Sequence, residues 1–154
     1  MTSPAAISPL RTPARRALIV DDDVEDARIV ADTLAHEYEP RIMSLEAALR
    51  RFYDVNPQIL LVERWIRDPD QALRFVRNVR AARSDLGILF TSRRPMTLAE
   101  RVECWDADAD GWIMKPFHPS ELAAGVSRLV RRGGNNAGLH PPVEGTHHRH
   151  AAAS

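Results

Sequence analysis

The chain has 154 residues, of which 44% are hydrophobic and 27% are charged, which suits one globular domain and is too short for two ordinary ones. Basic and acidic residues number 21 each, so the net charge is zero, and the overall field does not favour binding to nucleic acid or to an acidic membrane surface. No apolar run approaches the length of a membrane span, so we expect a soluble, cytoplasmic protein with no direct DNA binding.

Low-complexity segments flank the expected domain. Residues 1–16 are rich in Pro, Ser, Ala and Arg, and residues 133–154 begin with two glycines and end in a histidine-containing tail. Both segments are predicted to be disordered, because they contain too few apolar residues to bury. Residues 17–132 are therefore the predicted folded unit. The tail histidines lack fixed geometry, so any transition metal would bind them adventitiously.

The first half of the folded unit alternates short apolar runs with longer amphipathic ones. The pattern predicts a strand over 17–20, a helix over 25–38, a weaker strand over 41–43 and a helix over 45–53 whose core side includes Leu49. Residues 59–63, ILLVE, then follow as an apolar run that ends in an acid. Such a run is typical of a strand that is buried on both faces.

The second half continues the alternation. We expect a helix that begins at Pro69, a strand over 88–91, a short helix over 97–105, a strand over 111–114, and a last helix that begins after His118, with Leu122, Val126, Leu129 and Val130 facing the core. Five strands that alternate with five helices predict a doubly wound, five-stranded parallel α/β sheet of the flavodoxin-like kind. Ligands of such sheets bind beyond the carboxyl ends of the strands.

Polar residues follow several of the predicted strands at that edge. Asp21, Asp22 and Asp23 follow the first strand, Glu63 ends the third, Thr91 ends the fourth and Lys115 follows the fifth. Carboxylates suit a divalent cation, while a hydroxyl and an ammonium suit phosphoryl oxygens, so the set predicts phosphoryl chemistry. Each feature alone is equally typical of a solvated turn that caps a helix. The chain has one lysine among its 21 basic residues, and that lysine lies in this set.

The motifs LIVDDD, ILLVE, ILFTS and GWIMKPF, in this order, resemble the receiver domain of two-component response regulators, and the resemblance covers residues 17 to about 132. It implies the receiver fold, with five strands and five helices in alternation. It also implies site roles: Asp21 and Asp22 as Mg²⁺ ligands, Thr91 as the switch hydroxyl, Lys115 as the family's lysine and Trp112 as the aromatic switch residue. The family's nucleophilic aspartate aligns with Glu63, and the carbonyl group of Trp65 aligns with a further metal ligand.

Glutamate keeps the charge of the family's nucleophile but adds one methylene, about 1.5 Å of reach. Misplacement on the order of 1 Å costs roughly a hundredfold in such chemistry, so normal phosphorylation is not expected at Glu63. Its carboxylate should instead pair with Lys115 or accept a hydrogen bond from Thr91, as in a permanently mimicked phosphorylated state. Glu63 remains a candidate Mg²⁺ ligand, although Arg64 or Arg67 could enter the acidic pocket and displace the metal.

Two functional hypotheses follow from these observations. The first is a stand-alone, atypical receiver that is not an enzyme: a sensor histidine kinase or another signalling protein acts on it, and it binds a downstream protein through its fourth helix, fifth strand and fifth helix. Trp112, Arg101 and Arg128 are the candidate contact residues there, and a homodimer is also an open alternative. The second is a small haloacid dehalogenase-type phosphohydrolase, to whose first motifs Asp21 and Asp23 are similar. The order of the later motifs disfavours it.

Overall fold

A computed structural model describes residues 15–135 of the chain, and their side chains as far as Leu129. Its five strands form one parallel sheet in the order β2-β1-β3-β4-β5. The elements are β1 (Arg15–Val20), α1 (Val24–Leu34), β2 (Tyr38–Met43), α2 (Leu45–Val55), β3 (Ile59–Glu63), α3 (Pro69–Ala82), β4 (Gly87–Ser92), α4 (Leu98–Asp106), β5 (Gly111–Met114) and α5 (Pro119–Asn135). The predicted doubly wound α/β fold is confirmed.

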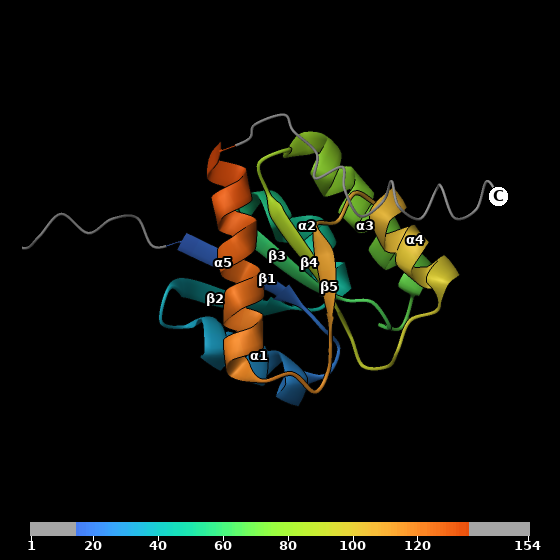
Figure 1. Cartoon of the computed structure of the whole chain (residues 1–154). Helices are drawn as coiled ribbons and strands as arrows, with labels where there is room; N and C mark the ends of the chain where they lie inside the picture. The colour runs from blue at the N-terminus through green and yellow to red at the C-terminus, as the bar shows by residue number, and fades with distance from the viewer. Residues whose placement is uncertain (1–14, 136–154) are drawn as a thin grey trace, which may run out of the picture.

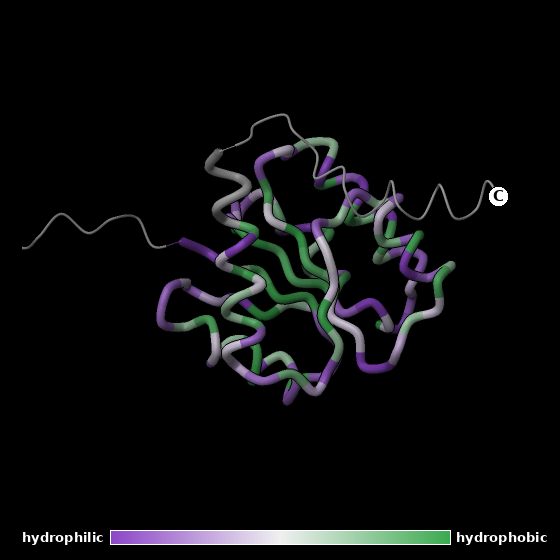
Figure 2. Tube along the Cα trace, viewed as in Figure 1, coloured by the Kyte–Doolittle hydropathy of each residue, from purple (hydrophilic) through white to green (hydrophobic). Residues whose placement is uncertain are grey.

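The helices cover both faces of the sheet (Figure 1). Helices α1 and α5 pack on one face, and α2, α3 and α4 pack on the other, so that the sheet separates two apolar clusters. All five side chains of β3 and all six of β4 are buried, because strands at the centre of such a sheet have a helix layer on each side. Figure 2 shows these central strands as the most hydrophobic part of the molecule. The polar residues that end these strands are therefore held by a rigid support.

Short polar side chains define where most helices begin. Asp23, Ser44, Asp68 and Thr97 each accept a hydrogen bond from a backbone N–H in the first turn of the next helix. These bonds satisfy donors that have no partner within the helix. His118 serves α5 in the same way, because its Nδ1 lies 3.2 Å from the backbone N of Ser120. None of the helices in the described part of the chain is long and apolar enough to cross a membrane.

Several predicted boundaries were wrong. The first helix ends at Leu34 rather than at Tyr38, because Tyr38 is the buried first residue of β2. His36 therefore lies exposed in the turn between them. Strand β1 begins at Arg15, and α5 continues through both glycines to Asn135, so each predicted end of the folded unit lies within regular structure. The predictions of disorder for 1–14 and 136–154, and the histidine tail, lie outside the described residues.

The predicted core faces of the helices were mostly right. In α2 the residues Leu45, Ala48 and Phe52 are buried as predicted, but Leu49 is 41% exposed. A helix turns by about 100° per residue, so a residue next to Ala48 lies at the border of the apolar face and not within it. In α5 the residues Leu122, Val126 and Leu129 are buried. The side chain of Val130 is beyond those described.

Two glycines provide a matched test of this packing. A Cβ at Gly87 would lie 3.2 Å from Leu129 Cβ and 3.3 Å from Ile59 Cγ2, whereas a Cβ at Gly125 would meet nothing within 4 Å. We expect Gly87→Ala to lower the free energy of unfolding by about 1 kcal/mol through overpacking. Gly125→Ala should raise it by up to about 1 kcal/mol, because alanine favours the helix.

Urea denaturation of the two variants beside the wild type measures both changes. Equal effects of the same sign at the two positions would show that α5 does not pack on the start of β4 as described.

Candidate functional site

The carboxyl ends of β1, β3 and β4 bring three polar residues together. Glu63 pairs in register with Thr91 across β3 and β4, and Val20 pairs with Val62, which places Asp21 beside Glu63. Asp21, Glu63 and Thr91 are 5%, 0% and 3% exposed. Because parallel strands all end at one edge, residues distant in the sequence meet here without any special loop.

The Glu63 carboxylate has a partner at each oxygen. Oε2 accepts a hydrogen bond from Thr91 Oγ1 at 3.0 Å and lies 2.9 Å from Lys115 Nζ. Oε1 accepts from the backbone N–H of Trp65 at 3.2 Å, and from the backbone N–H and Nε–H of Arg93 at 3.3 and 3.4 Å. A buried carboxylate with this many donors is held firmly in one position.

Lys115 is the cation at the centre of the site. Its Nζ lies 2.7 Å from Asp21 Oδ2, 2.9 Å from Glu63 Oε2 and 3.1 Å from Asp26 Oδ2. The hydrogen bond from the Lys115 backbone N–H to the Ser92 carbonyl group, at 2.7 Å, fixes where the side chain begins. One ammonium thus bridges β1, β3 and the first turn of α1. Its three donors suit three separate oxygens, which a planar guanidinium does not match.

Burial and charge act on this cluster in opposite directions. Burial raises the pKa of Asp21 above its usual value, and the neighbouring Glu63 adds to this, although the hydrogen bond from Lys115 works against it. Burial also opposes the charge of Lys115, but the hydrogen bonds and charges of Asp21 and Glu63 together outweigh it, so the pKa of Lys115 is raised. Asp21 and Glu63 are therefore both paired with the single ammonium group of Lys115.

The three predicted metal ligands do not converge. Asp21 and Glu63 both point their oxygens at Lys115, while Asp22 is exposed and its Oδ2 accepts from the Arg67 backbone N–H at 2.9 Å. Between residues 15 and 135 no group of three or more His, Cys, Asp or Glu side chains is placed to hold a metal ion. In this arrangement the three side chains do not gather around one point, and a magnesium site at Asp21, Asp22 and Glu63 stays a prediction.

Comparisons with known proteins agree on one kind of domain. No protein-family model matches the sequence. The chain is 32% identical over 123 residues to the response regulator MprA of Mycobacterium avium, covering 76% of this chain and 51% of that protein. It is 26% identical over 123 residues to the phosphate regulon transcriptional regulatory protein PhoB of Klebsiella pneumoniae, covering 77% and 53%. The chain thus spans about half the length of these curated relatives.

Solved structures that match the chain also come from response regulators. A response regulator receiver domain protein from Methanospirillum hungatei, described as CheY-like, matches with a TM-score of 0.70 at 23% identity, covering 79% of this chain and 97% of that one. A candidate response regulator from Chloroflexus aurantiacus matches with a TM-score of 0.69 at 28% identity, covering 77% and 99%. The chain has the receiver fold. Its relatives and structural neighbours are receiver domains of response regulators.

Within this receiver fold, the prediction for Arg64 was wrong. Its side chain is 2% exposed and points to α4, where Nη2 lies 2.5 Å from Glu103 Oε2. The Arg67 side chain is exposed, and its backbone N–H makes the contact to Asp22. The arginine that does reach Glu63 is Arg93, from the loop after β4.

Sequence reasoning missed two residues of the site. Asp26 lies in the first turn of α1 and contacts Lys115, and Arg93 contacts Glu63 with both its backbone and its side chain. Both residues follow the end of a strand by a few positions, so their place in the loops after the predicted strands is the signal in the sequence that indicates them. Whether Arg93 or Arg64 contacts Glu63 depends on the direction that each side chain takes. The alternation along β3 does not extend past its last residue, so the pattern could not give that direction.

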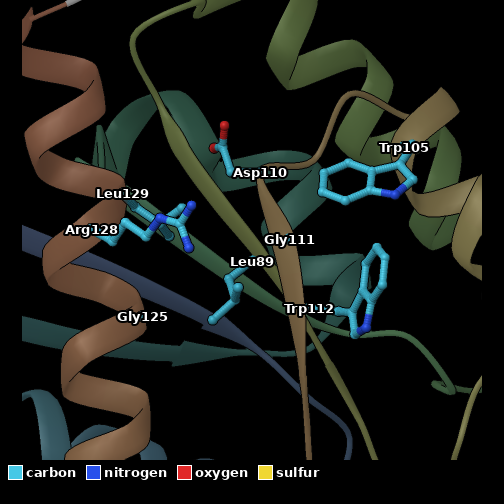
Figure 3. Close-up of a pocket in the computed structure, with 8 residues that line it drawn as sticks. All are labelled: Leu89, Trp105, Asp110, Gly111, Trp112, Gly125, Arg128 and Leu129. Carbon is cyan, nitrogen blue, oxygen red and sulfur yellow. The ribbon is translucent and has the colours of Figure 1, made fainter. Parts of the chain in front are cut away.

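Trp112 lies away from Glu63, on the side of β5 that faces α4. Its ring meets that of Trp105 edge to face, with centroids 4.9 Å apart and an interplanar angle of 63°. Figure 3 shows the two indoles on one side of β5, and Arg128 and Leu129 of α5 on the other. A hollow of about 320 Å³ lies among these residues. The predicted contact surface of the fourth helix, fifth strand and fifth helix therefore has both aromatic and cationic groups.

Removing the shared cation should destabilise the fold. We expect Lys115→Met to lower the free energy of unfolding by about 3–5 kcal/mol near pH 7, because it takes the ammonium away from two buried acids, Asp21 and Glu63. The raised pKa of Lys115 means that its contribution is complete below the ordinary value of 10.5 and is lost as the pH rises through the folded value. The raised pKa of Asp21 means that its ionisation costs stability as the pH rises above 3.8.

Denaturation of Lys115→Met beside the wild type should thus show the largest difference near neutral pH and a smaller one near pH 4, where Asp21, with its raised pKa, takes up a proton. The double variant Lys115→Met with Glu63→Gln serves as the control. It should recover part of the loss, since one buried charge is removed. A loss unchanged by Glu63→Gln would show that the pairing of Lys115 with Glu63 is not what stabilises the fold.

Proposed function

We propose that the chain acts as a receiver module in two-component signalling, and that it works through protein contact without normal aspartyl phosphorylation. The receiver fold and the similarity to response regulators support the first part of this proposal. The identity and surroundings of Glu63 support the second. Signal transfer would then depend on which protein binds the domain and not on a phosphoryl group at this position.

One observation carries the proposal. The Glu63 carboxylate contacts both Thr91 Oγ1 and Lys115 Nζ, at 3.0 and 2.9 Å. The resemblance to receivers assigns these two groups to the bound phosphoryl group. The extra methylene of glutamate thus places a carboxylate oxygen where a phosphoryl oxygen would otherwise meet them. A fixed negative charge there imitates the modified state and leaves no room for an incoming phosphoryl group.

The partners belong to the same proposal. An upstream sensor histidine kinase or another signalling protein would meet the domain at the Glu63 edge. A downstream protein would bind on the surface formed by α4, β5 and α5, where Trp105, Trp112 and Arg128 surround the hollow in Figure 3. Aromatic and arginine side chains are the ones that contribute most at protein interfaces. A second copy of the chain would use the same surface, and direct DNA binding is not proposed.

Restoring the shorter acid tests the proposal. We expect a small acyl phosphate with Mg²⁺ to label Glu63→Asp about a hundredfold faster than the wild type, because a displacement on the order of 1 Å is removed. Intact mass spectrometry, together with hydroxylamine treatment that cleaves acyl phosphates, measures the label.

Glu63→Asn supplies the background, since it has no nucleophile and nearly the size of aspartate. Rapid Mg²⁺-dependent labelling of the wild type that disappears in Glu63→Gln would overturn the proposal. Failure of both the wild type and Glu63→Asp to be labelled would contradict the view that one methylene separates this site from an active one.

The phosphohydrolase hypothesis has no support from the comparisons. The relatives and structures named above are response regulators and receiver domains. Asp21, which that hypothesis makes the nucleophile, is instead paired with Lys115 at 2.7 Å.

A further inference from the structure

Trp65, two residues after Glu63, has two arginines stacked on its indole ring. The guanidinium carbon of Arg94 lies 3.7 Å from the ring centroid, and that of Arg64 lies 4.5 Å from it. The ring edge is held as well, because Nε1–H donates to Ser92 Oγ at 2.9 Å. Cations that lie over an indole ring are attracted by its π electrons. Trp65 is therefore held by three residues, Arg64, Ser92 and Arg94, from the ends of β3 and β4 and the loops that follow them.

Both arginines also bind α4. Arg94 forms a two-pronged ion pair with Glu100, with Nη1–Oε1 and Nη2–Oε2 distances of 3.1 and 2.7 Å. Arg64 Nη2 meets Glu103 Oε2 at 2.5 Å. Residues 100 and 103 are three apart, so they lie on the same side of the helix. The stack on Trp65 thus connects the tip of β3 to the first two turns of α4 at two points.

The start of α4 is held by the same group of residues. Glu100 closes a capping box: its side chain accepts from the Thr97 backbone N–H, and the Thr97 side chain accepts from the Glu100 backbone N–H. The ion pair and these bonds lower the pKa of Glu100 to about 2. One carboxylate therefore serves both the helix cap and the arginine stack, so the two cannot move independently.

Arg64 is unusual for its burial. It is the largest of the side chains that are almost wholly enclosed, and it follows Glu63 directly. Its guanidinium also donates to the Pro69 carbonyl group at 3.3 Å, while its Nε is buried without a hydrogen-bond partner among the described residues. A buried cation tolerates little displacement from its counter-ion, because separation leaves an uncompensated charge. Movement of α4 away from β3 would cause such a separation of Arg64 from Glu103.

We propose that Arg64, Trp65 and Arg94 form a clamp that holds α4 in one position against the tip of β3. Helix α4 lies at the surface proposed above for the downstream protein, so the clamp presents that surface in a fixed form. The inference goes beyond the proposed function, since it concerns how α4 is held and stands whether or not Glu63 can be phosphorylated. Arg64 and Arg94 are positioning residues, acting through Trp65 and the two glutamates.

Hydrogen exchange tests the clamp. We expect the backbone amides of residues 98–106 to exchange about tenfold faster in Arg64→Met and in Arg94→Met than in the wild type, because local opening of α4 becomes easier. The amides of β1 and β3 should keep their wild-type rates. Arg77→Met is the matched control, since Arg77 is exposed on α3 and its side chain forms no ion pair or hydrogen bond with the described residues.

Arg94 lies at the surface, with half of its side chain exposed, so its variant tests the clamp even where Arg64→Met fails to fold. A fluorine label on the indole of Trp65 gives a second readout: one sharp resonance in the wild type, and exchange broadening in either variant. Unchanged exchange at α4 in Arg94→Met would overturn the proposal. So would an equal acceleration throughout the domain, which would indicate a general loss of stability.

Discussion

The site depends on one buried ammonium that two acids share. Lys115 lies between Asp21 and Glu63, at 2.7 and 2.9 Å, where little water can screen the charges. Without the cation, Asp21 would lose its ion-pair partner at the edge of a closed apolar core, and Glu63 would keep only its contact with Arg93. The positions of β1, β3 and β5 are thus linked by electrostatics as well as by the sheet. The first turn of α1 joins the same network through Asp26.

In the function proposed here, the extra methylene of Glu63 decides what this network can do. The Glu63 carboxylate reaches Thr91 and Lys115 directly, so the groups that would bind a phosphoryl oxygen are already satisfied by the protein itself. Satisfied buried polar groups are rigid, because any displacement leaves a donor or an acceptor unpaired. The arginine stack on Trp65 extends this rigidity to α4. The contacts that connect Glu63 with the proposed partner surface are therefore already formed in this structure.

Sequence patterns were sufficient for the fold and for most of the site. Parallel strands all end at one edge, so the polar residues after the apolar runs had to meet there, and Asp21, Glu63, Thr91 and Lys115 do meet. The longer side chain of Glu63, together with the resemblance to receivers, predicted a contact with Lys115 or with Thr91, and Glu63 contacts both. The end of α1 could not be predicted in this way, because residues 35–38 suit either element until Tyr38 is buried beside β1.

By itself, the sequence determined the order of the strands and helices along the chain, most of their buried faces, and the acid, Glu63, that ends the third strand. These follow from local periodicity and from residue identity. Only the tertiary structure decided which arginine approaches Glu63, where Arg64 is buried, and that Asp22 turns outward. Each of these depends on the direction that a side chain takes in a loop. That direction is set by partners distant in the sequence, such as Glu103 on α4 for Arg64.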